Sequence, residues 1–307
     1  MTQFSFATVN LEDGERAAVV LGGRYFRLDR VIPDLPAVGL RSLMERWDDL
    51  VERTSQLAAE PAAAASLEPA ALPMPKVLAP LRFPNKLICV GGVYEDHLRQ
   101  FKLPAERWPR MPIFLRPPTT SIVGPGPTVH VPKSTRQFDW EIELAVVLGR
   151  HVRHASEITV REAIAGYSIG IDFTCRDLLD RGSQMGVDLV RAKAQDDMAP
   201  LGPVIVPARF IANPQDLRLQ LWVNGKLRQD GNTAQMLYSV TEQISTISQF
   251  ITLEPGDVVF TGSPAGSAES DDEFLRPGDR IRAEIDRIGA LELELLPPRN
   301  SRATGDS

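Results

Sequence analysis

The chain has 307 residues, long enough for one large domain or two unequal domains with a buried core. Lys and Arg number 34 against 40 Asp and Glu, a formal net charge of −6, and no long single-sign run offers a surface to nucleic acid. Hydrophobic residues make up 43%, and no apolar stretch reaches the roughly 18 residues of a bilayer span. These features exclude nucleic acid and membrane as expected partners and predict a globular protein.

The beginning of the chain has no basic segment followed by an apolar block, so we expect no secretory signal and a cytoplasmic location. Cys89 and Cys175 lie far apart in the sequence and form no metal-type spacing. This arrangement favours two buried thiols in a reducing compartment.

Residues 1–75 predict a small N-terminal domain with a connecting arm. Alternation over residues 4–8 and a turn at Asp13-Gly14 indicate a β-meander. Apolar residues at helical spacing over residues 40–51 predict a helix of about four turns. Residues 58–75 are rich in Ala and Pro with little periodicity, which is typical of an arm laid over a surface.

Residues 76–297 predict a strand-rich α+β domain rather than a regular βαβ array. Strict alternation over residues 217–223 leads into Asn224-Gly225, a strong signal for a two-residue hairpin. Apolar spacing over residues 236–251 predicts a helix. The polar tail at residues 298–307 is expected to be disordered.

Two glutamates interrupt an apolar strand pattern in the middle of this domain. Glu141 and Glu143 share one face of the predicted strand, with Cα atoms about 7 Å apart, twice the strand rise. Two carboxylates at that spacing can bind one hard cation, which prefers oxygen ligands. An ordinary half-exposed strand with two solvated glutamates is the alternative. The opposite face carries Phe138, Trp140, Ile142, Leu144 and Val146.

A third carboxylate, Asp172, interrupts the apolar run at residues 167–175. A buried carboxylate costs several kcal/mol unless it is paired or bound to a metal. Arg176 or a hydroxyl could pair with it for structural reasons alone. Together with Glu141 and Glu143, Asp172 suggests a Mg²⁺ or Mn²⁺ site, and the lack of further His or Cys nearby argues against zinc.

His97 follows a strand pattern and the glycine turn at Gly91-Gly92. Histidine is well suited to general acid–base chemistry near neutral pH, and a structural histidine is the alternative. The two glycines do not form a G-x-G-x-x-G fingerprint, and no Rossmann pattern surrounds them. Dinucleotide binding is therefore excluded.

Seven ordered motifs resemble those of the fumarylacetoacetate hydrolase family over roughly residues 81–296, and the first 80 residues resemble the variable N-terminal unit of that family. The motifs are G-x-N-Y-x-x-H-x-x-E at 91–100, P-x-F-x-K-P at 112–117, D-W-E-x-E-L at 139–144, G-Y-x-x-x-N-D-x-[ST]-x-R-D at 166–177, K-x-x-D-x-x-x-P-L-G-P at 193–203, N-G-x-x-R-Q-x-G-N-T at 224–233 and T-L-E-P-G-D-V-[IV]-x-T-G-[ST]-P at 252–264.

The resemblance implies a core built as a mixed β-sandwich roll and, usually, a homodimer. It implies that Glu141, Glu143 and Asp172 bind Mg²⁺ or Mn²⁺, and that His97 and Lys193 are catalytic. The substrate-binding residues implied by the motifs are Arg116, Arg176, Gln229 and Thr261.

The activity that the resemblance implies is metal-dependent hydrolysis of a C–C bond in an acylpyruvate- or fumarylacetoacetate-like 1,3-diketo acid, in the catabolism of aromatic or sugar-derived compounds. Lys193 would add positive charge where an oxyanion develops, and His97 would activate the attacking water. The alternative within the family is a decarboxylase, isomerase or dehydratase of a related 2-oxo or 2-hydroxydienoic acid. A relative that only binds a metal or a 2-oxo acid is a third possibility.

One departure from the motifs bears on the choice among these activities. Gln100 stands where many family members carry Glu, three residues after the histidine. A glutamine can orient the His97 imidazole through a hydrogen bond but cannot stabilise imidazolium as a carboxylate does. This favours the alternative that needs no activated water. An acid from residues 269–273 would substitute if the 265–275 loop closes over the site. Arg116 replaces Lys and offers a two-pronged donor to a carboxylate.

Overall fold

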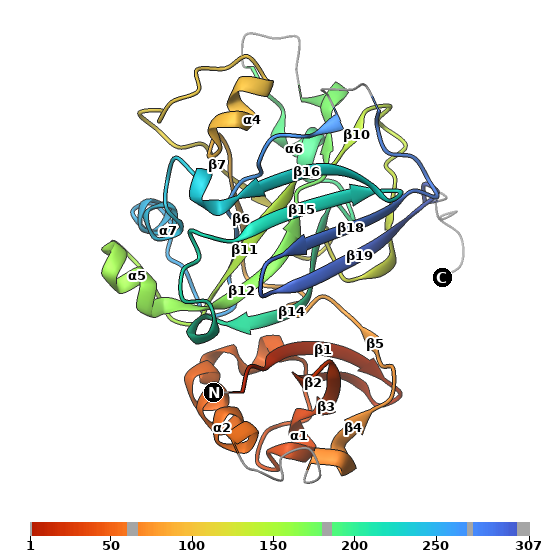
Figure 1. The fold of residues 1–307 in the computed structure, drawn as a ribbon, viewed down its shortest axis with the longest axis vertical. Coiled ribbons are helices and arrows are strands. Elements are labelled where there is room, and N and C mark those ends of the chain that lie inside the picture. The colour runs from red at the N-terminus through yellow and green to blue at the C-terminus, as the bar shows by residue number, and fades with distance from the viewer. Residues whose placement is uncertain (1, 60–66, 180–185, 269–272, 300–307) are drawn as a thin grey trace, which may run out of the picture.

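The computed structural model describes residues 2–59, 67–179, 186–268 and 273–299. It has a small N-terminal part, drawn at the bottom of Figure 1, and a larger strand-rich part above it. Mixed sheets with a few short helices confirm the predicted α+β class.

The N-terminal part begins with the expected meander of β1 (Ser5–Leu11), β2 (Gly14–Leu21) and β3 (Arg24–Arg27). The predicted helix starts as the 3-10 helix η1 (Leu40–Arg46) and continues as α2 (Trp47–Ala59), so it is longer than expected and irregular in its first half. The remaining elements are α1 (Leu28–Val31), η2 (Glu68–Ala70), β4 (Ala71–Leu72) and β5 (Lys76–Val77).

One sheet runs through both parts of the molecule. β1 pairs with β14 (Ala199–Pro207) of the larger part, with Phe6 opposite Ile205, and β5 pairs with β1. The strand order is β4-β3-β2-β1-β14-β12-β11-β17-β6-β7, with β5 and β8 attached beside it. The division at residue 75 stays a prediction. Residues 60–66 of the predicted arm, and the predicted tail from residue 300 onward, lie outside the described residues.

The central strand β11 (Ile142–Leu148) is buried on both faces. Its even-numbered residues belong to one apolar cluster, and Ala145 and Val147 belong to a second. A strand covered on both sides reads as a continuous apolar run, so Glu143 stands in the interior of the protein. β11 pairs with β12 (Ile164–Ile171) and β17 (Val258–Phe260), and β6 (Leu87–Val90) and β7 (Ile113–Arg116) follow β17 in the sheet.

A second sheet of five strands closes the other side of the core, in the order β16-β15-β18-β19-β9 (Figure 1). Asn224 and Gly225 have φ angles of 51° and 81°, which confirms the predicted two-residue hairpin between its first two strands. The strands are β16 (Lys226–Asn232), β15 (Arg218–Val223), β18 (Arg280–Ile285), β19 (Gly289–Leu296) and β9 (Gly126–His130).

Short elements connect the two sheets, and α7 (Val240–Ser248) is shorter than the predicted helix. The others are β8 (Ile122–Val123), β10 (Phe138–Asp139), β13 (Thr174–Cys175), α4 (Glu95–Gln100), α5 (Glu157–Ala163), α6 (Leu189–Lys193), η3 (Arg176–Leu178), η4 (Ala208–Phe210) and η5 (Thr233–Gln235).

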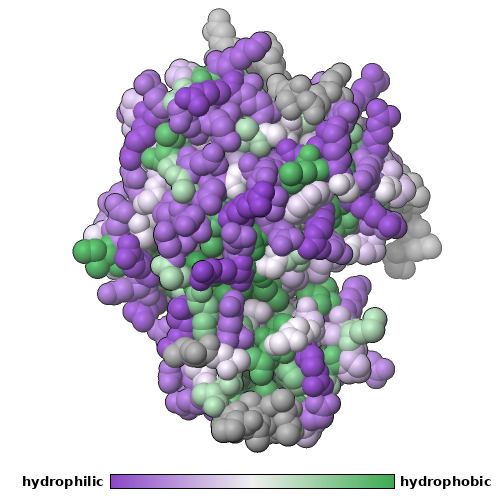
Figure 2. All heavy atoms as spheres, viewed as in Figure 1, coloured by the Kyte–Doolittle hydropathy of each residue, from purple (hydrophilic) through white to green (hydrophobic). Residues whose placement is uncertain are grey.

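The surface is mainly polar on the face shown in Figure 2, where hydrophobic residues gather on the N-terminal part and near its junction with the larger part. Within the described ranges, no helix is both long and apolar enough to cross a membrane. Cys89 and Cys175 are free, buried thiols, as predicted.

Candidate metal centre and active site

Three carboxylates meet at one end of the β11–β12 pair. Glu143 lies in β11, Glu141 lies in the break between β10 and β11, and Asp172 follows β12. The Asp172 N–H donates to the Glu141 carbonyl oxygen at 2.8 Å, which continues the antiparallel ladder beyond Ile142 and Ile171. One oxygen from each carboxylate lies within 4.8 Å of the others. Because Glu141 and Glu143 are only 5% and 2% exposed, the alternative of two solvated glutamates is wrong.

Buried cations surround these carboxylates. Lys193 Nζ, at the end of α6, lies 2.7 Å from Glu141 Oε2 and also contacts Asp172. Arg116 pairs with the second oxygen of Asp172. Arg176 pairs instead with Glu141 and, at 2.7 Å, with Asp139, so the expectation that Arg176 satisfies Asp172 is wrong. The cause is position: Arg176 starts η3 beside the β10–β13 pair, on the Asp139 side of the site.

The ion pairs within the cluster go to Glu141 and Asp172, whereas Glu143 pairs with no cation among the described residues. Burial and the nearby Asp172 and Glu141 raise the pKa of Glu143 well above its ordinary value. Burial also opposes ionisation of Glu141, but Lys193 and Arg176 outweigh it, so the pKa of Glu141 is lowered. The Gly262 N–H donates to Glu143 at 2.5 Å. Three hard oxygen donors crowded in this way fit a divalent cation such as Mg²⁺ or Mn²⁺.

His97 lies on α4 at the edge of this cluster, with Nε2 3.7 Å from Glu141 Oε1. Its ring packs edge-on against Phe101, with centroids 4.7 Å apart. Burial lowers the pKa of His97 to about 4, although Glu141 acts in the opposite direction. The imidazole is therefore neutral near pH 7, with one protonated and one unprotonated ring nitrogen.

Gln100 makes no hydrogen bond to the His97 imidazole, although its position three residues after His97 allowed one. Its Nε2 donates to Ser267 Oγ at 2.6 Å, and its Oε1 accepts from the Gly266 N–H at 2.8 Å. His97 Nδ1 is buried and has no hydrogen-bond partner within the part of the chain that the structure describes. The sequence could not indicate this, because the competing partners lie more than 160 residues along the chain.

The predicted acidic substitute is not placed at the site. Residues 269–272 of the 265–275 loop lie outside the described residues. Glu273 lies on the surface, where it pairs with Lys226 and Arg228.

The predicted substrate-binding residues lie around the carboxylates, but their polar groups bond to the protein. Arg116 donates to the carbonyl oxygens of Met198 and Phe173 at 2.8 and 2.7 Å. The Thr261 hydroxyl donates to the Leu144 carbonyl oxygen at 2.8 Å. Substrate binding by Arg116, Arg176, Gln229 and Thr261 stays a prediction. Gln229 accepts from the Ile142 N–H and donates to Ser263 Oγ and the Pro264 carbonyl oxygen.

Two further residues contact the site and were not singled out from the sequence. Asp139 Oδ1 accepts from the Ala268 N–H at 2.7 Å while its other oxygen binds Arg176, and burial raises the pKa of Asp139. Gly262 has a φ of 91°, and a Cβ there would lie 2.8 Å from that of Val93. The signal for each was its place in a motif, at the start of D-W-E-x-E-L and inside T-G-S-P.

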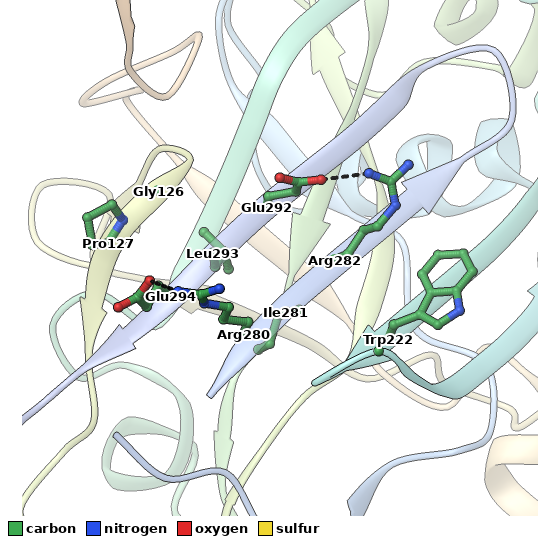
Figure 3. A pocket seen from close by; sticks show the side chains of 10 residues that line it. Gly126, Pro127, Trp222, Arg280, Ile281, Arg282, Glu292, Leu293 and Glu294 are labelled. Carbon is green, nitrogen blue, oxygen red and sulfur yellow. Dashed lines mark hydrogen bonds and ion pairs between the residues drawn. The ribbon is translucent and has the colours of Figure 1, made fainter. Parts of the chain in front are cut away.

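A separate hollow of about 650 Å³ lies on the outer face of β18 and β19 (Figure 3). Cross-strand ion pairs join Arg282 to Glu292 at 2.6 Å and Arg280 to Glu294 at 3.4 Å across it. No predicted site residue lines this hollow.

The larger part of the chain matches a known protein family. Residues 86–295 match the model of the fumarylacetoacetate (FAA) hydrolase C-terminal family. The chain is 35% identical over 274 residues to the mitochondrial oxaloacetate tautomerase FAHD2B of Homo sapiens, covering 88% of this chain and 83% of the relative.

Two solved structures share the fold over nearly the whole chain. The maleylpyruvate hydrolase from Sphingobium sp. SYK-6, in complex with manganese(II) ion and pyruvate, is 27% identical with a TM-score of 0.76 and covers 95% of this chain and 100% of that one. The 2-hydroxyhepta-2,4-diene-1,7-dioate isomerase from Mycobacterium marinum is 26% identical with a TM-score of 0.72, covering 97% and 100%.

Proposed function

Because this chain belongs to the fumarylacetoacetate hydrolase family, whose members are enzymes, we propose that it is a divalent-metal-dependent tautomerase. Its substrate in this proposal is a small 2-oxo dicarboxylic acid such as oxaloacetate, interconverted between the enol and keto forms. The similarity to an oxaloacetate tautomerase over most of both chains supports this choice over the hydrolysis implied by the motifs.

The observation that carries the proposal is the absence of a dedicated carboxylate beside His97 among the described residues. Gln100 is bound to Gly266 and Ser267, and Glu141 is already paired with Lys193 and Arg176. Because burial and the nearby Arg176 and Lys193 outweigh the effect of Glu141 and lower the pKa of His97, the imidazole is a weak base for activating water. Tautomerisation needs no attacking water, so it suits this arrangement better than hydrolysis.

In the enol-to-keto direction the O–H bond and the C=C π bond are lost, a C=O π bond and a C–H bond form, and no carbon–carbon single bond is broken. Neutral His97 carries both a proton and a lone pair, so it can exchange a proton with the substrate. Burial opposes the charged form of Lys193, but Asp172 and Glu141 outweigh it and raise its pKa, so the ammonium stays charged beside the developing enolate oxygen. Glu141, Glu143 and Asp172 would hold a divalent cation, which would supply Lewis acidity when bound.

Hydrolysis of an acylpyruvate-like acid is the second candidate, and a specific similarity favours it. The maleylpyruvate hydrolase with manganese and pyruvate shares the fold over 95% of this chain. The similarity to the isomerase of the same fold supports a hydroxydienoic acid as a further candidate substrate. The homodimer and the cytoplasmic location also remain proposals.

One experiment separates the two reactions. The purified protein, with Mn²⁺ or Mg²⁺ and then with excess chelator, is given enol-oxaloacetate and, separately, acetylpyruvate. We expect the protein with metal to accelerate the loss of the ultraviolet absorbance of enol-oxaloacetate, and the chelator to abolish this acceleration. We expect no pyruvate or acetate to form from acetylpyruvate. Production of pyruvate and acetate without enol-oxaloacetate turnover would overturn it in favour of the hydrolase.

A further inference from the structure

Side chains from several elements hold the segment 262–268 over the site. At its start, the Gly262 N–H donates to Glu143. Further along, the Trp140 indole N–H donates to the Gly266 carbonyl oxygen at 3.1 Å, and the Ala268 N–H donates to Asp139. The segment is thus held at one end by Glu143, a member of the carboxylate cluster, and at the other by Asp139, which Arg176 links to Glu141.

Gln100 connects α4, the helix that carries His97, to the segment 262–268. Its amide accepts from the backbone of Gly266 and donates to the Ser267 side chain, so both ends of the amide are used. Residues three apart lie on one side of a helix, so Gln100 and His97 face the same region. α4 has only six residues and no side-chain cap at Tyr94, and an isolated helix of this length is unstable.

The backbone at Gly266 is shaped to receive this amide. Gly266 has a φ of 105°, and a Cβ there would lie 2.1 Å from the Arg228 carbonyl oxygen. Only glycine fits that approach, and the resulting turn directs the N–H to Gln100 and the carbonyl oxygen to Trp140.

The His97 ring has no hydrogen bond of its own at Nδ1 within the described ranges, so its placement depends on packing and on α4. We propose that Gln100 is a positioning residue, which fixes α4 and the His97 ring against the 262–268 segment. The kinetic part of this inference rests on the proposed tautomerase function, whereas the attachment itself does not.

Replacement of Gln100 by a residue of similar size tests the attachment. Q100M keeps the length of the side chain but removes both hydrogen bonds, whereas Q100E keeps acceptors for the Gly266 N–H and the Ser267 hydroxyl. We expect Q100M to lower kcat for enol-oxaloacetate about tenfold, with KM and Mn²⁺ affinity changed less than twofold, and Q100E to recover at least a third of the wild-type kcat. The matched control Q56M removes an exposed glutamine of α2 that bonds to Glu52.

Two outcomes would overturn the proposal. One is a Q100M enzyme with wild-type kcat. The other is a fall in kcat accompanied by a rise in KM and a fall in Mn²⁺ affinity of similar size. That result would indicate a general structural defect rather than misplacement of one ring. Hydrogen exchange separates the inference from the proposed function: the Gly266 amide should exchange at least tenfold faster in Q100M than in wild type, with β11 unchanged. Unchanged exchange at Gly266 refutes the attachment even if the enzyme has a different substrate.

Discussion

Replacing Lys193 by Met should weaken the protein without metal and, at the same time, strengthen its binding of metal. The Lys193 ammonium contacts Glu141 and Asp172, two of the three residues that fit a cation. In the metal-free protein it therefore neutralises the carboxylates with which a divalent ion would compete. K193M therefore removes the ion-pair partner of Glu141 and Asp172 and, at the same time, the group that competes with the metal ion for them.

The expected loss of stability in metal-free K193M depends on the ion-pair partners that Glu141 and Asp172 keep. Removing one member of a buried ion pair costs about 3–5 kcal/mol. Glu141 keeps Arg176 and Asp172 keeps Arg116, so we expect the lower end, about 3 kcal/mol, or a fall in Tm of about 6 °C. Loss of charge beside the developing oxyanion should lower kcat by about a hundredfold or more.

Calorimetry of metal-free and Mn²⁺-saturated protein at pH 8 measures both effects. We expect Mn²⁺ to bind K193M at least tenfold more tightly than wild type and to reduce the Tm difference by more than half. K86M is the matched control, because Lys86 pairs with Glu254 and Asp257 on another part of the protein, and it should lower Tm without changing Mn²⁺ affinity. Weaker Mn²⁺ binding by K193M would refute the competition described here.

Three further predictions concern the same region. E143Q should leave the metal-free protein at least as stable as wild type, because it removes a carboxylate crowded by Asp172 and Glu141; thermal melts check this. E143Q should also weaken Mn²⁺ binding by about a hundredfold or more, which titration calorimetry checks. Because the pKa of Glu143 is raised, Mn²⁺ binding displaces a proton at pH values below that pKa, so Mn²⁺ affinity should rise with pH. Calorimetry in buffers of different ionisation enthalpy would measure the proton release, and no release at any pH tested would contradict a raised pKa of Glu143. G266A should lower the free energy of unfolding by about 2 kcal/mol or more through backbone strain and the contact with Arg228, whereas G225A, where a Cβ meets nothing within 4 Å, should cost less.

The three carboxylates could be predicted because two physical rules converge on them. Strand alternation put Glu141 and Glu143 on one face, and the cost of burying a lone carboxylate marked Asp172. Alternation could not show that the chain breaks between β10 and β11, where Asp139 accepts from the Trp140 N–H. The grouping survives because the backbone bond from Asp172 to Glu141 continues the pairing across the break.

Long-range partners were beyond prediction from local pattern. Gln100 and the 262–268 segment meet only because β6, which precedes α4, and β17, which precedes the segment, lie side by side in the sheet. Nothing in the residues around Gln100 encodes that neighbour. The hairpin at Asn224-Gly225 is the opposite case, since two residues with positive φ determine it locally.

The pairing of β1 with β14 joins the N-terminal part to the sheet that carries the predicted site residues. Every predicted site residue lies at His97 or beyond, yet β1 covers one border of the sheet on which they are built. An uncovered strand border offers its backbone groups to other chains and promotes aggregation. Phe6 and Trp47 stack edge-to-face at this junction, and the Trp47 indole N–H donates to the Ala165 carbonyl oxygen. By pairing with β14, the N-terminal part covers backbone groups that would otherwise be exposed at this border of the sheet.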